Sequence, residues 1–167
     1  RGRPRRPARA AHARPGAPVR AAPRLALSLQ GATDFDALPV RATLRRWVAR
    51  ALEGDAELTL RFVAEAEARA LNRAYRRKSY APDVLTFDYA HAPVVLADIV
   101  ICVPVAAREA AVQGKPWRQH LAHLVVHGVL HAQGYDHESD RDAARMEARE
   151  VAILASLRVP DPYSARS

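Results

Sequence analysis

The 167-residue sequence contains a single cysteine, Cys102, and no long run of apolar residues. One cysteine cannot form an internal disulfide bond, and the segment ADIVICV (97–103) predicts a buried strand, so we interpret Cys102 as a core residue and not as a nucleophile. No stretch approaches the roughly 20 apolar residues needed to cross a bilayer, and none has the apolar core of a secretory signal. We therefore expect a cytoplasmic protein that has no contact with membranes.

Acidic residues are absent from the first 24 positions, which carry eight arginines. This segment accounts for the whole formal net charge of +8, because residues 25–167 contain 18 basic and 18 acidic residues. Apart from His12 and Val19 it consists of Arg, Pro, Ala and Gly, so it has almost nothing to bury. We predict a disordered basic tail over residues 1–24 and one domain over residues 25–167.

Three interpretations of this basic tail stay open. It could contact RNA phosphates weakly and in a salt-dependent way, or it could be an extension without a role. A transit peptide would also be rich in arginine, but the five prolines of the segment oppose the amphipathic helix that such a peptide forms.

The hydrophobic pattern of the remaining chain changes repeatedly between strand and helix periodicity. Alternating or short continuous apolar runs predict strands over 25–30, 57–64, 84–89 and 97–103. Apolar stripes with Pro, Gly or Ser at their ends predict five helices: between Pro39 and Gly54, from Ala64 to Tyr75, between Pro104 and Gly114, from Pro116 to Gly134, and after the capping box of Ser139 and Asp142. The cationic segment 76–83 is expected to be an exposed loop. The order β-α-β-α-β-β-α-α-α predicts an α/β domain with a small mixed sheet of about four strands packed with about five helices.

Five of the seven histidines lie within eighteen residues, at positions 120, 123, 127, 131 and 137. His127 and His131 are four residues apart, so they project from one face of the predicted helix, about one turn from each other. Gly134 permits the left-handed conformation that reverses the chain, after which His137 can return toward them. Three nitrogen ligands leave one coordination position open to water, which is typical of catalytic zinc, whereas structural zinc has four protein ligands. We predict one zinc ion per chain, bound by His127, His131 and His137.

The spacing HxxxHxxxxxH also occurs in zinc peptidases, in which a glutamate follows the first histidine and acts as the general base. Here that position is Gly128, which cannot accept a proton, so the peptidase interpretation loses its central residue. His123 lies one turn before His127 and is assigned to packing or to orienting the ligands. The role of His120 stays open.

The run HLAHLVVHGVLHAQGYDH (120–137) closely resembles the signature of the YbeY family of bacterial endoribonucleases and ribosomal RNA maturation factors. Three further segments are similar to other blocks of that family: Tyr75-Arg76 with the Lys78 loop and DVLTF (83–87), ADIVIC (97–102), and Asp161-Pro162-Tyr163. The resemblance extends from about Leu25 to Ser167 and excludes the basic tail. Ala132 and Gln133 depart from it, because these positions are commonly apolar in the family.

The resemblance implies a zinc-dependent endoribonuclease that acts on single-stranded RNA. Its substrate would be precursor ribosomal RNA near the 3′ end of the 16S RNA, and its partner the small ribosomal subunit. The resemblance places the zinc on His127, His131 and His137 and an essential arginine at Arg76. A guanidinium suits that position because it can donate two hydrogen bonds to a phosphate that gains negative charge when its phosphorus is attacked.

Other residues and functions are weighed beside this interpretation. Arg77 and Lys78 are candidates for further contacts with RNA phosphates, or they are solvated charges. Asp98 is a candidate for orienting the metal ligands or for docking a partner, or it simply begins a strand. Two alternatives to the nuclease stay open: a non-catalytic assembly factor in which zinc stabilises the fold around bound RNA, and the metallopeptidase.

Overall fold

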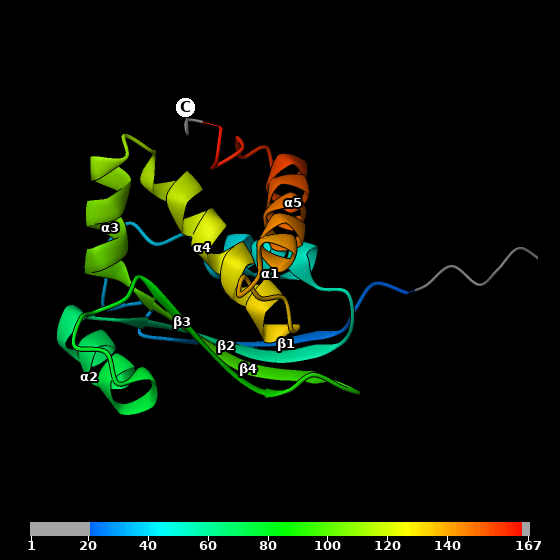
Figure 1. Ribbon diagram of the computed structural model, residues 1–167, viewed down its shortest axis with the longest axis horizontal. Coiled ribbons are helices and arrows are strands. Elements are labelled where there is room, and N and C mark those ends of the chain that lie inside the picture. Colours follow the sequence, from blue (N-terminus) through cyan, green and yellow to red (C-terminus); the bar gives the residue numbers. More distant parts are fainter. Residues whose placement is uncertain (1–20, 165–167) are drawn as a thin grey trace, which may run out of the picture.

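The computed structural model describes residues 21–164 (Figure 1). The basic tail predicted over 1–24 falls outside the described residues except for its last four. Of these, Arg24 already belongs to the folded domain, because its backbone N–H donates to Asp55 Oδ1 at 2.8 Å and its carbonyl accepts from Ala56 N at 2.9 Å.

Four strands and five helices follow one another in the order predicted from the sequence. They are β1 (Leu25–Gln30), α1 (Arg41–Ala51), β2 (Ala56–Val63), α2 (Glu65–Arg76), β3 (Val84–Ala90), β4 (Val95–Cys102), α3 (Val103–Val112), α4 (Trp117–Ala132) and α5 (Asp140–Ser156). The capping box is present, since the Ser139 side chain accepts a hydrogen bond from Asp142 N at the start of α5. Several boundaries differ from the prediction by one or two residues: β4 begins at Val95, and Arg76 is the last residue of α2 and not part of the loop. Arg77 caps this helix with the left-handed φ of 55°.

The strands form one mixed sheet in the order β1-β2-β4-β3, as the fold class predicted. β1 pairs with β2 and β2 with β4 in parallel, while β3 runs antiparallel to β4. The register places side chains of all four strands in rows across the sheet. One such row consists of Leu29, Leu60, Ile99 and Thr86.

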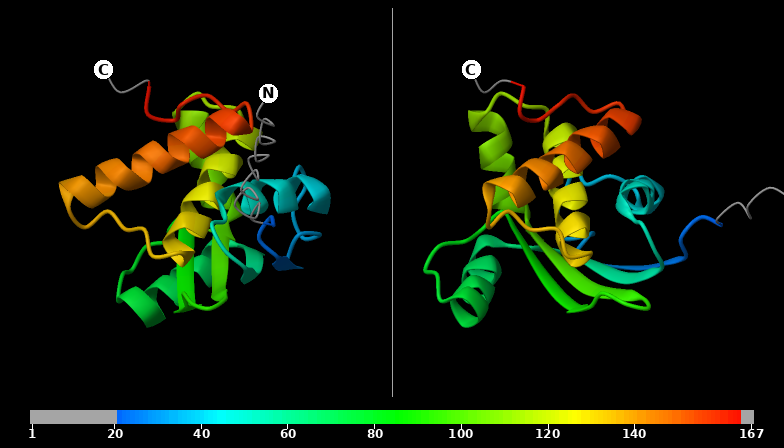
Figure 2. Two further views of the ribbon diagram at one scale, coloured as in Figure 1. Left: turned by 90° about the vertical axis from the view of Figure 1, so that its right-hand side faces the viewer. Right: turned by 45° about the vertical axis from the view of Figure 1, so that its right-hand side comes forward.

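Helices cover the sheet unequally (Figures 1 and 2). α1, α4 and α5 lie on one face, and α2 lies on the other. The larger core lies under α4 and contains side chains such as Leu60, Ile99 and Val125. A smaller cluster of Val63, Ala68, Leu85, Val100 and Cys102 lies against α2. β4 is therefore covered on both faces over much of its length, as its continuous apolar sequence predicted.

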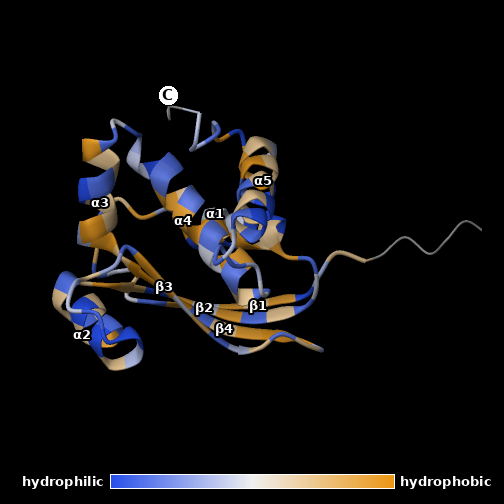
Figure 3. Ribbon diagram, in the orientation of Figure 1, coloured by the Kyte–Doolittle hydropathy of each residue, from blue (hydrophilic) through white to orange (hydrophobic). Residues whose placement is uncertain are grey.

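Hydrophobic residues are concentrated in the strands and on the inward sides of the helices (Figure 3). Cys102 is buried in the smaller cluster, which confirms its interpretation as a core residue, and burial raises the pKa of its thiol. Among residues 21–164, no helix combines the length and the apolar character that crossing a membrane requires.

Candidate metal centre

His127, His131 and His137, which we call the histidine trio, converge at the C-terminal end of α4. Gly134 has a φ of 96°, and the N–H of the next residue, Tyr135, returns to the Leu130 carbonyl at 3.1 Å, so the chain reverses there as predicted. One ligand nitrogen from each histidine lies within 4.8 Å of the other two. The sequence spacing therefore predicted a real spatial cluster.

The chemistry of the histidine trio fits a zinc ion. Burial, together with the neighbouring His127 and His137, lowers the pKa of His131 to about 4. His131 is therefore neutral at physiological pH, and the neutral imidazole is the form that binds metals. Three imidazoles are a donor set that zinc favours, and they leave a fourth tetrahedral position for water or substrate.

Glu150, on α5, lies against the histidines of α4, and it was not predicted from the sequence as a site residue. Its carboxylate is fully buried, with Oε1 2.5 Å from His127 Nδ1 and Oε2 2.9 Å from His123 Nε2. The Tyr163 hydroxyl also donates to Oε2. Burial alone would raise the pKa of Glu150, but the hydrogen bonds from His123, His127 and Tyr163 outweigh it and lower the pKa to about 2. The carboxylate is therefore ionised and can only accept hydrogen bonds.

A signal for Glu150 exists in the sequence. It lies on the same stripe of α5 as Met146, Ile153 and Leu154, all of which are buried. A glutamate within an apolar stripe must either be exposed or have a buried partner. The stripe alone does not name that partner, because His123 and His127 come from another helix.

A second group of potential ligands overlaps with the first and consists of His123, His127 and Glu150. Both carboxylate oxygens of this group already accept hydrogen bonds, and its carboxylate is fully buried. The histidine trio instead lies on the wall of an open cavity. The trio is thus the better candidate for a metal that must reach a substrate, and His123 contacts the carboxylate beside it.

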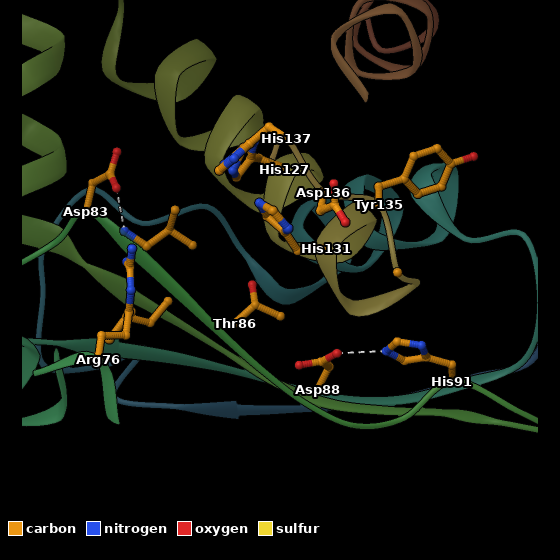
Figure 4. A pocket seen from close by; sticks show the side chains of 13 residues that line it. Arg76, Asp83, Thr86, Asp88, His91, His127, His131, Tyr135, Asp136 and His137 are labelled. Atoms are coloured by element: carbon orange, nitrogen blue, oxygen red, sulfur yellow. Dashed lines mark hydrogen bonds and ion pairs between the residues drawn. The ribbon is translucent and has the colours of Figure 1, made fainter. Parts of the chain in front are cut away.

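A cavity of about 510 Å³ extends from the histidine trio toward the end of α2 (Figure 4). Its charged and titratable lining, apart from the trio, consists of Arg76, Asp83, Asp88, His91, Tyr135 and Asp136. Thr86 lies between Arg76 and the trio, and a hydrogen bond of 2.7 Å joins His91 Nε2 to Asp88 Oδ2 at another part of the wall. The cavity combines a cation, possible metal ligands and carboxylates, which is an arrangement suited to hydrolytic chemistry.

Two contacts hold the end of α2, and with it Arg76, beside the sheet. The ring of Tyr75 packs edge-on against Phe87 of β3, with the ring centroids 4.6 Å apart. The buried side chain of Asn72 donates to the Tyr80 carbonyl at 2.9 Å and so ties the loop after α2 to the helix. Arg76 and the trio, about fifty positions apart in sequence, are brought to one cavity by these packing contacts.

Gly128 lies between the two metal-ligand candidates of α4 and faces the sheet. A Cβ atom added there would be 2.6 Å from Ile99 Cγ2, and the Gly128 carbonyl accepts from Thr86 Oγ1 at 3.4 Å. A glutamate would therefore clash with the core at this position. This packing agrees with the argument against a peptidase of the HExxH type.

The other predicted site residues are not gathered at the cavity. Arg77 and Lys78 are exposed and do not line it. Asp98 lies on the sheet face opposite α4, where it accepts a hydrogen bond from the Tyr89 hydroxyl at 3.0 Å. A role for Asp98 in orienting the histidine trio does not fit that location. His120 is buried, with its Nε2 3.2 Å from Glu109 Oε2, and is not part of the trio.

Comparisons with known proteins match the chain to one family of enzymes. The family described as Endoribonuclease YbeY matches residues 31–158. The chain is 59% identical over 144 residues to the endoribonuclease YbeY of Thiobacillus denitrificans, covering 85% of this chain and 98% of that protein. It is 53% identical over 147 residues to the same enzyme of Aromatoleum aromaticum, covering 86% of this chain and 96% of that protein. A solution structure of a Thermotoga maritima protein superposes with a TM-score of 0.51 at 22% identity, covering 80% of this chain and 91% of the other, and this likeness supports the fold alone.

Proposed function

This chain belongs to the endoribonuclease YbeY family and is an RNA-cleaving hydrolase, and on that basis we propose that it cuts single-stranded RNA with one zinc ion bound by the histidine trio. The observation that carries this proposal is the location of His127, His131 and His137 on the wall of the same cavity as Arg76. Family membership also favours cleavage over the non-catalytic assembly factor considered from the sequence.

The protein's own residues prepare the metal centre. When bound, zinc supplies a Lewis acid that polarises the phosphoryl oxygen and activates water. Glu150 Oε1 lies 2.5 Å from His127 Nδ1, on the side of that ring away from its other nitrogen. His131 is neutral and can bind the ion without a prior deprotonation, and the exposed His137 lines the cavity after the turn at Gly134.

Arg76 is proposed to act on the phosphate. Its guanidinium is always charged and can donate two parallel hydrogen bonds to phosphoryl oxygens. Negative charge increases on these oxygens as phosphorus is attacked, so the interaction is stronger in the transition state than in the bound substrate. A cavity of about 510 Å³ is large enough for one phosphodiester and parts of the adjoining nucleosides. Arg77 and Lys78 remain candidates for contacts with phosphates outside the cavity.

The biological substrate follows from the family resemblance. We propose precursor ribosomal RNA near the 3′ end of the 16S RNA as the substrate, the small ribosomal subunit as the partner, and the cytoplasm as the location. The proposal for ribosomal RNA processing depends on kinship with the curated endoribonucleases and not on any contact seen in this protein.

The direct test is cleavage of a labelled single-stranded RNA by the purified protein with and without a chelator. We expect cleavage to stop after chelation and to return when zinc is added. A His131→Ala variant should lose both zinc and cleavage, while a Glu57→Gln variant, altered on the opposite face of the sheet, should keep both. Cleavage that survives metal removal would refute the zinc mechanism.

A further inference from the structure

We propose that Glu150 is a positioning residue of the metal centre: it holds His127 in the tautomer whose Nε2 is free for the metal, and Tyr163 holds Glu150 in place. This inference rests on the metal site proposed above and assigns roles to two residues outside the histidine trio.

The Glu150 carboxylate lies where an ionised group needs hydrogen-bond partners. Glu150 is fully buried between α4 and α5, where an ionised carboxylate is costly unless each oxygen has partners. Oε1 lies 2.5 Å from His127 Nδ1 and Oε2 lies 2.9 Å from His123 Nε2, and Oε2 also accepts from the Tyr163 hydroxyl. An apolar residue would pack at this position at a lower cost in free energy, so we infer that the carboxylate is needed for its hydrogen bonds to the neighbouring side chains.

The contact with Glu150 selects one tautomer of His127. A neutral imidazole has one N–H and one lone pair, and either nitrogen can carry the proton. A carboxylate only accepts, so the nitrogen that faces Glu150 carries the proton and Nε2 keeps the lone pair. The hydrogen bond also fixes the orientation of the ring about its Cβ–Cγ bond. A ligand oriented in this way binds a metal more tightly, because neither its tautomer nor its rotation must be selected on binding.

The Asp161-Pro162-Tyr163 segment supplies no ligand to the metal site, but it reaches the same carboxylate. The Tyr163 N–H donates to Asp161 Oδ1 at 2.8 Å, and Lys115 Nζ donates to the Pro162 carbonyl at 2.8 Å. These bonds hold the segment near the start of α4. The Tyr163 ring packs edge-on against His123 with centroids 5.4 Å apart, and its hydroxyl reaches Glu150. The segment thus completes the hydrogen bonding of the buried carboxylate.

Zinc affinity tests the inference. Metal-free protein would be titrated with zinc against a chromophoric chelator for the parent, Glu150→Gln, Tyr163→Phe and, as a matched control, Glu57→Gln, whose side chain is exposed. We expect Glu150→Gln to weaken zinc binding by about 10- to 100-fold, as is typical when the partner of a metal-bound histidine is changed. Tyr163→Phe should weaken it less, and Glu57→Gln should not change it. Parental affinity in Glu150→Gln would overturn the inference, and parental affinity in Tyr163→Phe alone would refute the role given to Tyr163.

A spectroscopic measurement separates positioning from a general loss of structure. Long-range proton–nitrogen correlation spectra of the imidazoles report which nitrogen carries the proton. In the metal-free parent we expect His127 to be protonated at Nδ1, and in Glu150→Gln we expect a mixture of tautomers or the other tautomer. If His127 in the parent is protonated at Nε2, the inference is wrong. Should Glu150→Gln fail to fold, Tyr163→Phe still tests it, because this change removes one hydroxyl and keeps the ring.

Failure of this inference differs from failure of the proposed function. If the parent binds no zinc, or if His131→Ala binds it as the parent does, the metal site itself is refuted. The latter result would favour the overlapping group of His123, His127 and Glu150. If the parent binds zinc, His131→Ala does not, and Glu150→Gln binds like the parent, only the role of Glu150 is refuted.

Discussion

Replacing Gly128 with alanine should destabilise the protein although alanine favours helices. The new Cβ would be 2.6 Å from Ile99 Cγ2, whereas carbon atoms in contact are about 3.5–4.0 Å apart. Either α4 or the side chain of Ile99 must therefore move by about 1 Å, because that is the difference between the two separations. Ile99 cannot move easily, since it is fully buried in β4 and its strand is paired on both sides with β2 and β3.

The expected loss in the free energy of unfolding is the difference between two opposing contributions. Overpacking a core costs about 1–3 kcal/mol, and exchanging glycine for alanine within a helix returns at most about 1 kcal/mol. Because Ile99 is held on both sides, we expect the upper part of this range and a net loss of about 2 kcal/mol. α4 carries His127 and His131 on either side of the change, so a shift of the helix should also weaken zinc binding.

Chemical denaturation of the metal-free protein measures this loss, with Gly54→Ala as the control. A Cβ at Gly54 meets no atom within 4 Å, so that change should alter stability by less than about 0.5 kcal/mol. Combining Gly128→Ala with Ile99→Ala should cost less than the sum of the single changes, because the new methyl group fills part of the cavity left by Ile99. A Gly128→Ala protein as stable as the parent, or strictly additive changes, would refute the packing argument.

Two further predictions concern pH and the basic tail. The pKa of His131 is lowered from 6.5 to about 4 in the folded protein, so the unfolded chain binds more protons between these two pH values. The metal-free protein should therefore be most stable above about pH 6.5 and should lose stability as the pH falls toward 4. If the free energy of unfolding of His131→Ala depends on pH in the same way as that of the parent, this prediction is wrong. Deleting residues 1–20 should leave the melting temperature and zinc content unchanged, because their composition offers no core, and a large fall in melting temperature would show that the segment contributes to the fold.

The sequence predicted the elements and the convergence of three histidines because both are encoded by local spacing. His127 and His131 share a helical face by their separation alone, and Gly134 marks the reversal that returns His137. The apolar run 97–103 likewise predicted a strand covered on both faces. These inferences needed no knowledge of which elements are neighbours.

Features that depend on the contact of distant elements could not be predicted in the same way. Glu150 looks like an isolated charge on α5 until α4 places two histidines against it. Asp98 looks like a candidate beside the site until the sheet register puts it on the opposite face. In the sequence, Gly128 is notable only because it stands where the peptidase motif has its glutamate base. In the structure, the absence of a side chain at Gly128 lets α4 approach Ile99.

Arg76 is proposed to stabilise the charged transition state of a zinc-dependent cleavage. Single-turnover cleavage of single-stranded RNA at saturating enzyme tests it, with zinc content measured for every variant and Arg77→Ala as the neighbouring control. We predict that Arg76→Ala keeps its zinc and binds RNA with a modest loss but cleaves much more slowly than the parent, while Arg77→Ala cleaves at nearly the parental rate. An Arg76→Ala protein that keeps its zinc and reaches the parental saturated rate would remove Arg76 from the chemistry and contradict the account.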